Sequence, residues 1–527
     1  MSATTNIVNL DALIKRADLA APGEQGEDIS SLSVLGLEPK GMLFPALRKP
    51  DFQRETANWT PEQVADLIIT FARRDLIPAV ILWRAGQDVF VIDGAHRLSA
   101  LVAWVHDDYG DREISQRHFQ NLIPDDQKRA AFRTRELVNM AIGSFQDHKI
   151  AIDHPLNARK DVAERAARIA WQEIPAQWIR NADHDKAEKA FFRINQGGTK
   201  IDSTERRILA ARHSATAFAA RSILRAGTGH NYWKKFSAET AKNIEALGGE
   251  IYDLLFKPVI QLPIKTLDVP LAGHGYGPRT LPFVFDLVNI INKVQVKDSS
   301  YKKLETGDNL GIDEDGSQTI KYLLTVKSML LRICSTDPSS LGIHPGLYFY
   351  TKGGTFQSAS LLSYVALFLD WTTDDFRKFS KVRSRFEEFI LNNKGVTEAI
   401  SKLGSGARSR PRVTSLYRKI IEYLNEDKSQ KEIAEELSKD SDFDFFVAHQ
   451  TVTDLFSSIE SAFSRDVKGA AYLRDALPSA PRCPSCGGAM HRNGMQIGHK
   501  NARRDGGTGE LANAMMQHPF CNSTMAN

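Results

Sequence analysis

The chain has 527 residues, 42% of them hydrophobic and 25% charged, which is typical of a globular protein with room for two to four domains. No apolar run reaches the roughly 18 residues that a membrane-spanning helix needs, and the first residues lack the apolar core of a signal peptide. We therefore expect a cytoplasmic protein without a membrane partner. The formal net charge of +4 is too small to identify a partner by itself.

The N-terminal part begins with polar and glycine-rich pieces over residues 1–45, which we interpret as an extension. A helix is predicted from Pro61, because Thr60 and Gln63 fit a capping box around a proline at the first helical position. The segments "LIPAVILWR" and "DVFVID" are predicted as strands joined across "AGQ". The second strand runs into "GAHR" and then into a helix with apolar residues at helical spacing. The predicted unit is a strand, a tight turn and a helix.

Four residues at this turn are candidates for a phosphate site, namely Asp93, Gly94, His96 and Arg97. A helix N-terminus presents backbone N–H groups and a positive dipole end to an anion, and Arg97 adds a forked set of donors. On spacing alone, a purely structural strand-turn-helix explains these residues at least as well. No P-loop sequence occurs in the chain, so a nucleotide site here is not of the P-loop kind.

The surrounding segment resembles the GmrS-type N-terminal domain of modification-dependent (type IV) restriction systems, a branch of the ParB/sulfiredoxin-like superfamily. The resemblance rests on "DFQRETANWT", "LIPAVIL", "VIDGAHRLSAL" and "FFRINQGGTKIDSTERRIL". It implies a mixed α/β domain over 46–215 that binds a nucleoside triphosphate (NTP) and either hydrolyses it or only senses it, because Ala95 replaces a glutamine usual in the signature. The residues that it implies in nucleotide binding are Asp93, Gly94, His96, Arg97, Gln53, Arg54, Arg193 and Asn195.

The middle of the chain is predicted to be mainly helical over 216–475. A helical pattern already begins near residue 130 and is interrupted by "INQGGTK", after which Asp202 and Glu205 fit a capping box. The stretch "LGSGARSRPRV" at 403–413 is predicted as a loop that serves either as a linker or as a phosphate contact. Helical periodicity covers 319–333, 357–371, 373–393, 414–425 and 429–438.

Four candidate metal ligands lie near the C-terminus. Cys483 and Cys486 form one pair with two residues between its members, and His518 and Cys521 form a second pair with the same spacing. Two such pairs are typical of a tetrahedral structural zinc site. Three cysteines in one short segment favour a metal over disulfides, and a metal stabilises a unit too small to have a core of its own. We therefore predict structural Zn²⁺ and a separate unit over 476–527.

Between and beside these ligand pairs lie "GHKNARRDGG", Asn513 and "CN", an arrangement that resembles the HNH nuclease family with its ββα-metal unit. The resemblance implies that His499 is the general base that activates water. It also implies that Asn513 fixes the Ω-loop and so orients His499. It also implies that Asn522 binds the catalytic cation, Mg²⁺ or Mn²⁺. These roles agree with phosphodiester hydrolysis, which needs an activated water and a cation that neutralises the developing charge.

One position departs from the HNH pattern. Many members have an aspartate directly before the first histidine as a second metal ligand, whereas this chain has Gly498. Either Asp505 or the substrate phosphate completes the metal shell, or the unit binds nucleic acid without cutting it. Within 480–527, five Lys and Arg residues face two acidic residues, an excess of positive charge that suits a polyanion.

Together these features predict an α+β multidomain protein with a ParB/sulfiredoxin-like N-terminal domain, a helical middle and a zinc-clipped HNH unit. The predicted function is a nucleotide-regulated endonuclease that cleaves foreign, including modified, DNA in bacterial anti-phage defence. Two alternatives stay open: a non-cleaving ParB-like nucleotide switch on DNA, and an RNA-directed toxin nuclease, because HNH chemistry acts on a phosphate rather than on a base. The sequence does not decide between a monomer and a homo-oligomer.

Overall fold

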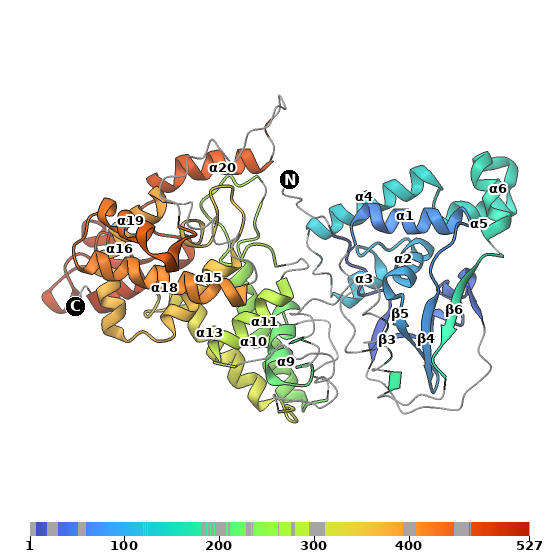
Figure 1. The fold of residues 1–527 in the computed structure, drawn as a ribbon, viewed down its shortest axis with the longest axis horizontal. Helices are drawn as coiled ribbons and strands as arrows, with labels where there is room; N and C mark the ends of the chain where they lie inside the picture. Colours follow the sequence, from blue (N-terminus) through green and yellow to red (C-terminus); the bar gives the residue numbers. More distant parts are fainter. Residues whose placement is uncertain are drawn as a thin grey trace.

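The computed structural model shows an N-terminal region that contains a sheet and a larger helical region that ends in a small hairpin unit (Figure 1). No helix in the described part of the chain is long and apolar enough to cross a bilayer. The structure describes residues 7–17, 30–50, 59–119, 121, 123, 125–169, 171–180, 186–187, 190, 194, 207–208, 211–227, 233, 235–261, 263–275, 280–294, 311–393, 406–446, 463 and 465–525.

The N-terminal region is built on a six-stranded sheet in the order β1-β3-β5-β4-β6-β2. β4 and β5 form an antiparallel hairpin at its centre, β3 pairs parallel with β5, and β6 pairs parallel with β4. At the two edges, β1 pairs parallel with β3 and β2 pairs antiparallel with β6. The strands are β1 (Lys15–Ala17), β2 (Ser31–Ser33), β3 (Leu47–Pro50), β4 (Val80–Ala85), β5 (Asp88–Asp93) and β6 (Glu173–Trp178).

Both faces of this sheet carry buried side chains. Along β5, Val89 and Val91 pack into the large core formed with the helices, while Phe90 and Ile92 belong to a smaller cluster on the other face. The helices of this region lie above the sheet in the view of Figure 1. They are α1 (Pro61–Ala72), α2 (Ala95–His106), α3 (Glu113–His118), α4 (Asp125–Ala141), α5 (Phe145–Asp153) and α6 (Lys160–Ile169).

The predicted start of α1 and the predicted strand-turn-helix unit are confirmed. Thr60 accepts a hydrogen bond from the backbone N–H of Gln63 at 3.3 Å, and the Gln63 side chain accepts one from the backbone N–H of Thr60 at 3.0 Å. β4, β5 and α2 follow one another in the expected order. Local capping and alternation therefore determine this part of the fold.

Two sequence-based expectations for this region are wrong. Residues 1–45 are not merely an extension, because β1 and β2 belong to the sheet and apolar side chains such as Leu10, Leu13 and Leu32 are buried in its core. The pattern from residue 130 is not helical throughout, because β6 interrupts it. In β6 the buried residues Ile174 and Ala176 alternate with exposed neighbours, as in a strand with one buried face.

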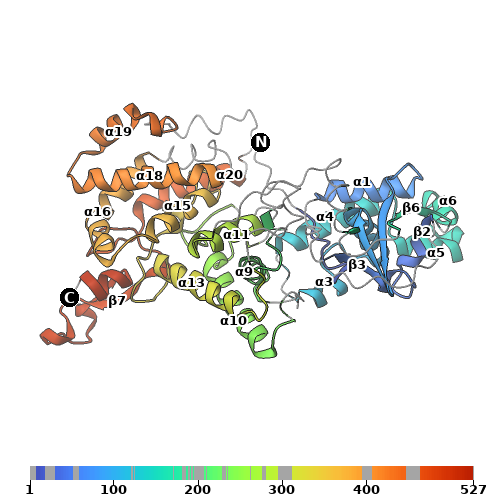
Figure 2. The ribbon, with the colours of Figure 1, turned by 60° about the horizontal axis from the view of Figure 1, so that its bottom comes forward.

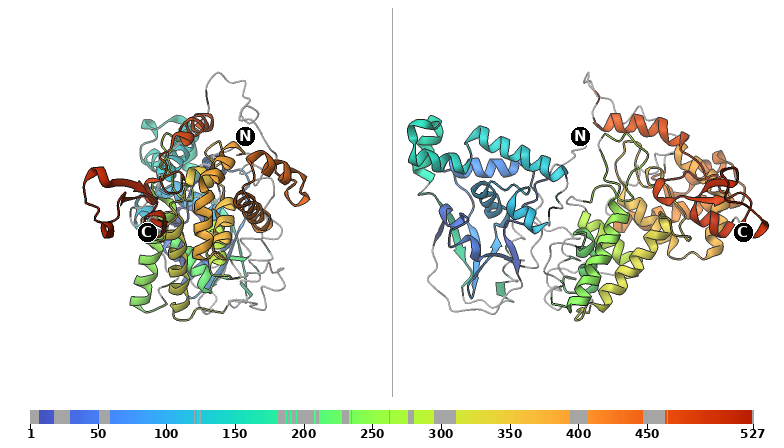
Figure 3. Two further views of the ribbon diagram at one scale, coloured as in Figure 1. Left: turned by 90° about the vertical axis from the view of Figure 1, so that its left-hand side faces the viewer. Right: turned by 180° about the vertical axis from the view of Figure 1, so that it is seen from behind.

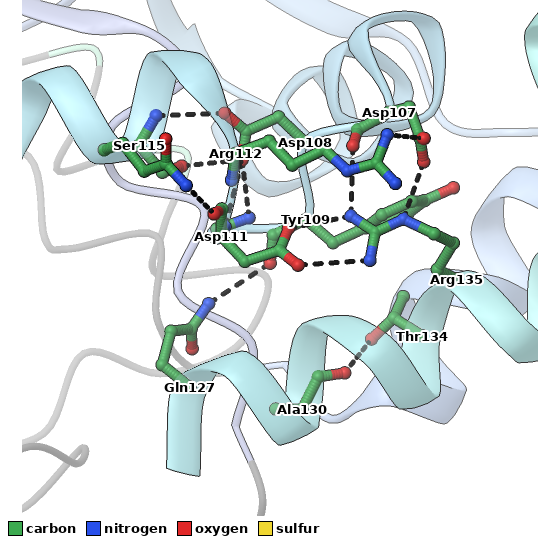
Figure 4. Close-up of polar contacts among 12 residues, drawn as sticks. Asp107, Asp108, Tyr109, Asp111, Arg112, Ser115, Gln127, Ala130, Thr134 and Arg135 are labelled. Carbon is green, nitrogen blue, oxygen red and sulfur yellow. Dashed lines mark hydrogen bonds and ion pairs between the residues drawn. The ribbon is translucent and has the colours of Figure 1, made fainter. Parts of the chain in front are cut away.

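A polar network anchors the C-terminal end of α2 (Figure 4). Arg135 of α4 donates hydrogen bonds to the carboxylates of Asp107 and Asp111, at 2.7 and 2.8 Å. The buried carboxylate of Asp108 accepts hydrogen bonds from the backbone N–H groups of residues 110–112 and so closes the turn into α3. The network holds α2 against α3 and α4, and with it the glycine turn at the other end of α2.

The helical region packs around one extended hydrophobic core that runs from α9 to Ala489 and also includes Phe520, after the C-terminal hairpin. The five segments with helical periodicity are confirmed as helices. The helices are α9 (Ala215–Leu224), α10 (Ala238–Phe256), α11 (Thr280–Ile291), α13 (Ser317–Ile333), α14 (Pro345–Tyr348), α15 (Ser358–Phe368), α16 (Thr373–Asn392), α18 (Gly406–Asn425), α19 (Gln430–Lys439) and α20 (Arg465–Ala476).

The loop predicted at 403–413 is wrong for most of its length, because α18 already begins at Gly406 and contains Pro411. Glycine and proline disfavour a helix interior. Here burial of Val413, Leu416 and Tyr417 in the helical core outweighs that preference. The capping box predicted at Asp202 and Glu205 lies outside the described residues.

A buried ion pair connects the two regions. Arg225, directly after α9, donates to the carboxylate of Asp11 at 3.0 Å, and the same carboxylate pairs with Arg16 and Lys49. All four side chains are buried. The N-terminal segment is thus tied both to the sheet and to the helical region.

The C-terminal unit lies at the end of the molecule away from the sheet (Figures 2 and 3). It contains an antiparallel hairpin of β7 (Gln496–His499) and β8 (Ala514–Gln517), followed by the helical turn η10 (Cys521–Met525). The helical region therefore separates this unit from the glycine turn before α2 (Figure 1).

Candidate functional site

The glycine turn between β5 and α2 requires a residue without a side chain. Gly94 is the N-cap of α2 with φ of 89°, a conformation that favours glycine. A Cβ on this residue would also lie 2.8 Å from Cγ1 of Val80 and 3.0 Å from Nη2 of Arg97. The backbone of the helix N-terminus is therefore left uncovered by any side chain of residue 94.

Asp93 and Arg97 meet across this turn. Nη2 of Arg97 donates to the Asp93 carboxylate at 2.8 Å and to the backbone oxygen of Ala79 at 3.1 Å. The ring of His96 packs against Trp59, with centroids 5.4 Å apart. The turn thus brings together the predicted residues Asp93, Gly94, His96 and Arg97. The other residues predicted for nucleotide binding lie outside the described residues, namely Gln53, Arg54, Arg193 and Asn195.

The four predicted zinc ligands converge on one point. One ligand atom from each of Cys483, Cys486, His518 and Cys521 lies within 4.8 Å of the others, and all four residues are buried. The cluster can hold a metal ion such as zinc. Met490 and Met495 pack against the cysteines, and the neighbouring Ala489 and Phe520 are buried in the core of the helical region.

Hydrogen bonds within the cluster shift the pKa values of its thiols in opposite directions. Hydrogen bonds from Cys486 and Cys521 lower the pKa of the Cys483 thiol, and the bond to Cys483 raises the pKa of Cys486 to about 11. Burial lowers the pKa of His518 and keeps its ring neutral. Nε2 of His518 lies 3.2 Å from the backbone oxygen of Ala489, and Nδ1 lies 3.3 Å from Sγ of Cys486. A proton on Nε2 that bonds to this oxygen leaves the Nδ1 lone pair directed at Sγ of Cys486 and at Nη1 of Arg383, which lies 3.2 Å away.

The turn that carries Cys483 and Cys486, called the knuckle below, is docked on α16 through a buried ion pair. The sequence analysis missed this ion pair. Arg383 and Glu387 are 1% and 0% exposed and are joined at 2.8 Å. The Glu387 carboxylate also accepts from the backbone N–H of Ala489, at 2.6 Å, and Arg383 donates to the backbone oxygens of Leu341 and Gly342. Because the charges lie four residues apart on a helix, the sequence pattern resembles an ordinary exposed pair.

Replacing Glu387 with glutamine is expected to lower the free energy of unfolding by about 3–5 kcal/mol, because it leaves Arg383 buried without a counter-charge. Urea unfolding of the full chain measures the change. Glu388→Gln is the matched control, since Glu388 is exposed on the same helix. Equal stability of the two variants would contradict the structural role of the pair.

The hairpin places His499 at the start of a loop whose two ends are tied by Asn513. His499 pairs with Ala514 at the end of β7 and β8. The Asn513 side chain accepts from the backbone N–H of Asn501 at 2.7 Å and donates to the backbone oxygens of Asn501 and Thr508, at 3.1 and 2.7 Å. Asn513 therefore ties the two ends of the loop that joins β7 and β8.

The imidazole of His499 has an acceptor nitrogen at Nε2. Nε of Arg503 donates a hydrogen bond to it at 3.4 Å. Near His499 the hairpin exposes Ile497 and Met516, which are 62% and 42% accessible. A partly exposed imidazole with an acceptor nitrogen can take a proton from water.

Asn522 lies beside Gly498. A Cβ on residue 498 would overlap both Oδ1 of Asn522 and Nε2 of Gln517. The missing aspartate therefore has a steric reason, because any side chain at position 498 would displace these two amides. Gln517 is fully buried, and its Nε2 has no hydrogen-bond partner in the described part of the chain. Asp505 forms an ion pair with Arg504 at 3.6 Å.

Residues 38–214 match the family model of the GmrSD restriction endonuclease, N-terminal domain. The match covers less than half of the chain and nearly coincides with the domain expected at 46–215. It supports a nuclease in restriction defence, with DNA as the substrate class. Comparison with curated proteins gave no match, and comparison with solved structures gave none.

The GmrSD-type segment contains the complete glycine turn, whereas the cysteine cluster and the hairpin lie outside it. The residues that sequence reasoning missed are Arg383, Glu387 and Gln517. A signal for Gln517 was present, because a glutamine directly before the ligand His518 is an unusual choice for a buried position. No local pattern marks the other two, since their burial depends on the packing of α16.

Proposed function

We propose that the chain is a nucleotide-regulated endonuclease of the HNH type that cuts foreign DNA in anti-phage defence. The observation that carries the proposal is the position of Asn513, whose side chain ties the ends of the loop that follows His499. The cysteine cluster, which is docked on α16, anchors the segments on either side of the hairpin. A hairpin, a fixed loop and a histidine with an acceptor nitrogen together form the frame for hydrolysis of a phosphodiester.

In this proposal His499 acts through Nε2. Water gives a proton to Nε2, its oxygen bonds to phosphorus, one P–O ester bond breaks, and the leaving oxygen takes a proton from solvent. The guanidinium of Arg503 leaves Nε2 and pairs with a phosphate oxygen as the backbone approaches. Asn522 would hold a divalent cation such as Mg²⁺ or Mn²⁺, which would supply positive charge to neutralise the phosphate. Asn513 keeps the loop, and so His499, in position.

The proposed nucleotide site is the glycine turn. Its support is the position of Gly94 at the N-terminus of α2 and the guanidinium of Arg97 beside it. The ion pair between Asp93 and Arg97 orients that guanidinium across the turn. We propose that a triphosphate binds there and that its occupancy alters cleavage at the distant hairpin through the helical region.

One experiment tests the function as a whole. Purified zinc-loaded protein is incubated with modified and unmodified phage DNA, with Mg²⁺ or Mn²⁺, with and without each NTP. We expect cleavage only with the metal, a rate that one NTP changes, and loss of this response in Arg97→Ala. Cleavage that no NTP alters would remove the regulatory part of the proposal.

A second candidate is a ParB-like nucleotide switch that binds DNA without cutting it. The absence of a carboxylate at Gly498 favours this reading, because the cation would lack its usual charged ligand. Binding of DNA without cleavage under every condition would select the switch. Cleavage of RNA but not DNA would select an RNA-directed nuclease instead.

A further inference from the structure

The space beside Gly498 is surrounded by side-chain amides rather than by carboxylates. Asn522 and Gln517 face Gly498, which is buried. Gln496 accepts a hydrogen bond from Asn522. Side-chain amide oxygens are ligands for hard divalent cations. This arrangement rests on the proposed nuclease function, because that function requires a cation beside Asn522.

The amide of Asn522 is oriented by a chain of hydrogen bonds from the helical region. Gln496 donates through Nε2 to the backbone oxygen of Thr336, which leaves its Oε1 directed at Asn522. Nδ2 of Asn522 donates to that Oε1 at 3.3 Å. The carbonyl oxygen of Asn522 therefore faces Gly498, where a ligand atom is needed.

The amide of Gln517 is held at one end only. Its Oε1 accepts from Oγ of Ser485 at 2.9 Å, while Nε2 faces Gly498 and is buried without a partner. A buried amide group without a hydrogen bond costs free energy. A half-turn about the last side-chain bond exchanges the two atoms with little change in shape. Nε2 then donates to Oγ of Ser485, and Oε1 faces Gly498 beside Oδ1 of Asn522.

We propose that Gln517 supplies, through its side-chain oxygen, the cation ligand that other HNH sequences supply through the aspartate before the histidine. The vacant side-chain position of Gly498 gives the two amide oxygens room to converge, since a Cβ there would overlap both groups. A bound cation satisfies the Gln517 oxygen, and Ser485 satisfies the amide nitrogen. A neutral ligand set holds the cation less tightly than one with a carboxylate.

The test measures Mn²⁺ binding to the zinc-loaded full chain by the electron paramagnetic resonance signal of free Mn²⁺, without nucleotide or DNA. Gln517→Leu is expected to weaken Mn²⁺ binding on the order of 10-fold, the range seen when groups that support a metal site are removed. Gln517→Glu is expected to bind Mn²⁺ more tightly than the wild type, because it adds a negative charge. Gln430→Leu is the matched control, since Gln430 on α19 is remote in sequence from the hairpin and bonds to Asn392.

Gln517→Leu with unchanged zinc content and unchanged Mn²⁺ affinity would overturn the proposal. If Gln517→Leu loses zinc, the Mn²⁺ affinities of Gln517→Glu and Gly498→Ala test the proposal instead. Tighter binding by the former and weaker binding by the latter support the role of Gln517, and wild-type affinity in both overturns it. A wild type that cuts DNA and binds Mn²⁺ while Gln517→Leu does both equally well refutes only this inference. A wild type that neither binds Mn²⁺ nor cuts refutes the proposed function as well.

Discussion

Replacing His499 with alanine is expected to slow DNA cleavage by on the order of 10²-fold or more, the range usual for loss of a general base. The reason is that Nε2 of His499 is the acceptor nitrogen at the start of the loop fixed by Asn513. The measurement is the single-turnover rate on supercoiled DNA at saturating metal. Zinc content should stay unchanged, because His499 is not one of the four clustered ligands.

A matched control is His154→Ala, which removes an exposed histidine at the end of α5. This variant should cut at the wild-type rate. A His499→Ala protein that cuts as fast as the control would place the base elsewhere, and the assignment of the hairpin as the cutting site would be lost.

Removing the metal cluster is expected to have the second large effect. Wild-type protein should contain one zinc per chain, and Cys483→Ala less than half an equivalent, because the remaining ligands cannot complete a tetrahedron. Structural zinc contributes about 10–16 kcal/mol of apparent binding free energy in small peptide units. The C-terminal unit has few apolar contacts of its own around the cysteines, so its hairpin should lose order and cleavage should stop.

Elemental analysis of undenatured protein measures the zinc, and proteolysis of the C-terminal unit reports its order. Cys334→Ala is the matched control, because Cys334 is buried like the others but contacts His491 instead of the cluster, with its sulfur 3.7 Å from Nδ1. It should retain a full equivalent of zinc. Full zinc in Cys483→Ala, or half-loading in the wild type, would remove the cluster as a metal site.

Local signals in the sequence predicted a large part of this molecule. Capping residues such as Thr60 and Gln63 interact over a few positions. In each pair of metal ligands, a short turn brings the two members together. The strand-turn-helix at Gly94 was predictable for the same reason. Within the capping box, the turn and each ligand pair, the residues that interact are close in sequence, so the pattern and the contact coincide.

The parts that were missed depend on contacts between distant residues. β1 and β2 are three residues long, too short to show an alternating pattern, and they exist because partners far along the chain pair with them. The burial of Arg383 is set by the packing of α16 against the knuckle. The role of Gly498 likewise requires knowing that Asn522 and Gln517 face it from other elements.

The docking of the knuckle on α16 has a consequence for biosynthesis. The surface that receives the knuckle, including Ser340 and Glu387, precedes it in the chain and so leaves the ribosome first. Phe520 then donates its backbone N–H to the oxygen of Ser340 at 2.8 Å, next to the last ligand, Cys521. We expect zinc capture to be a late event of folding, so that a polypeptide whose translation stops before Cys521 carries no assembled hairpin. Incomplete synthesis up to that point would then release no fragment in which the proposed cutting site is assembled.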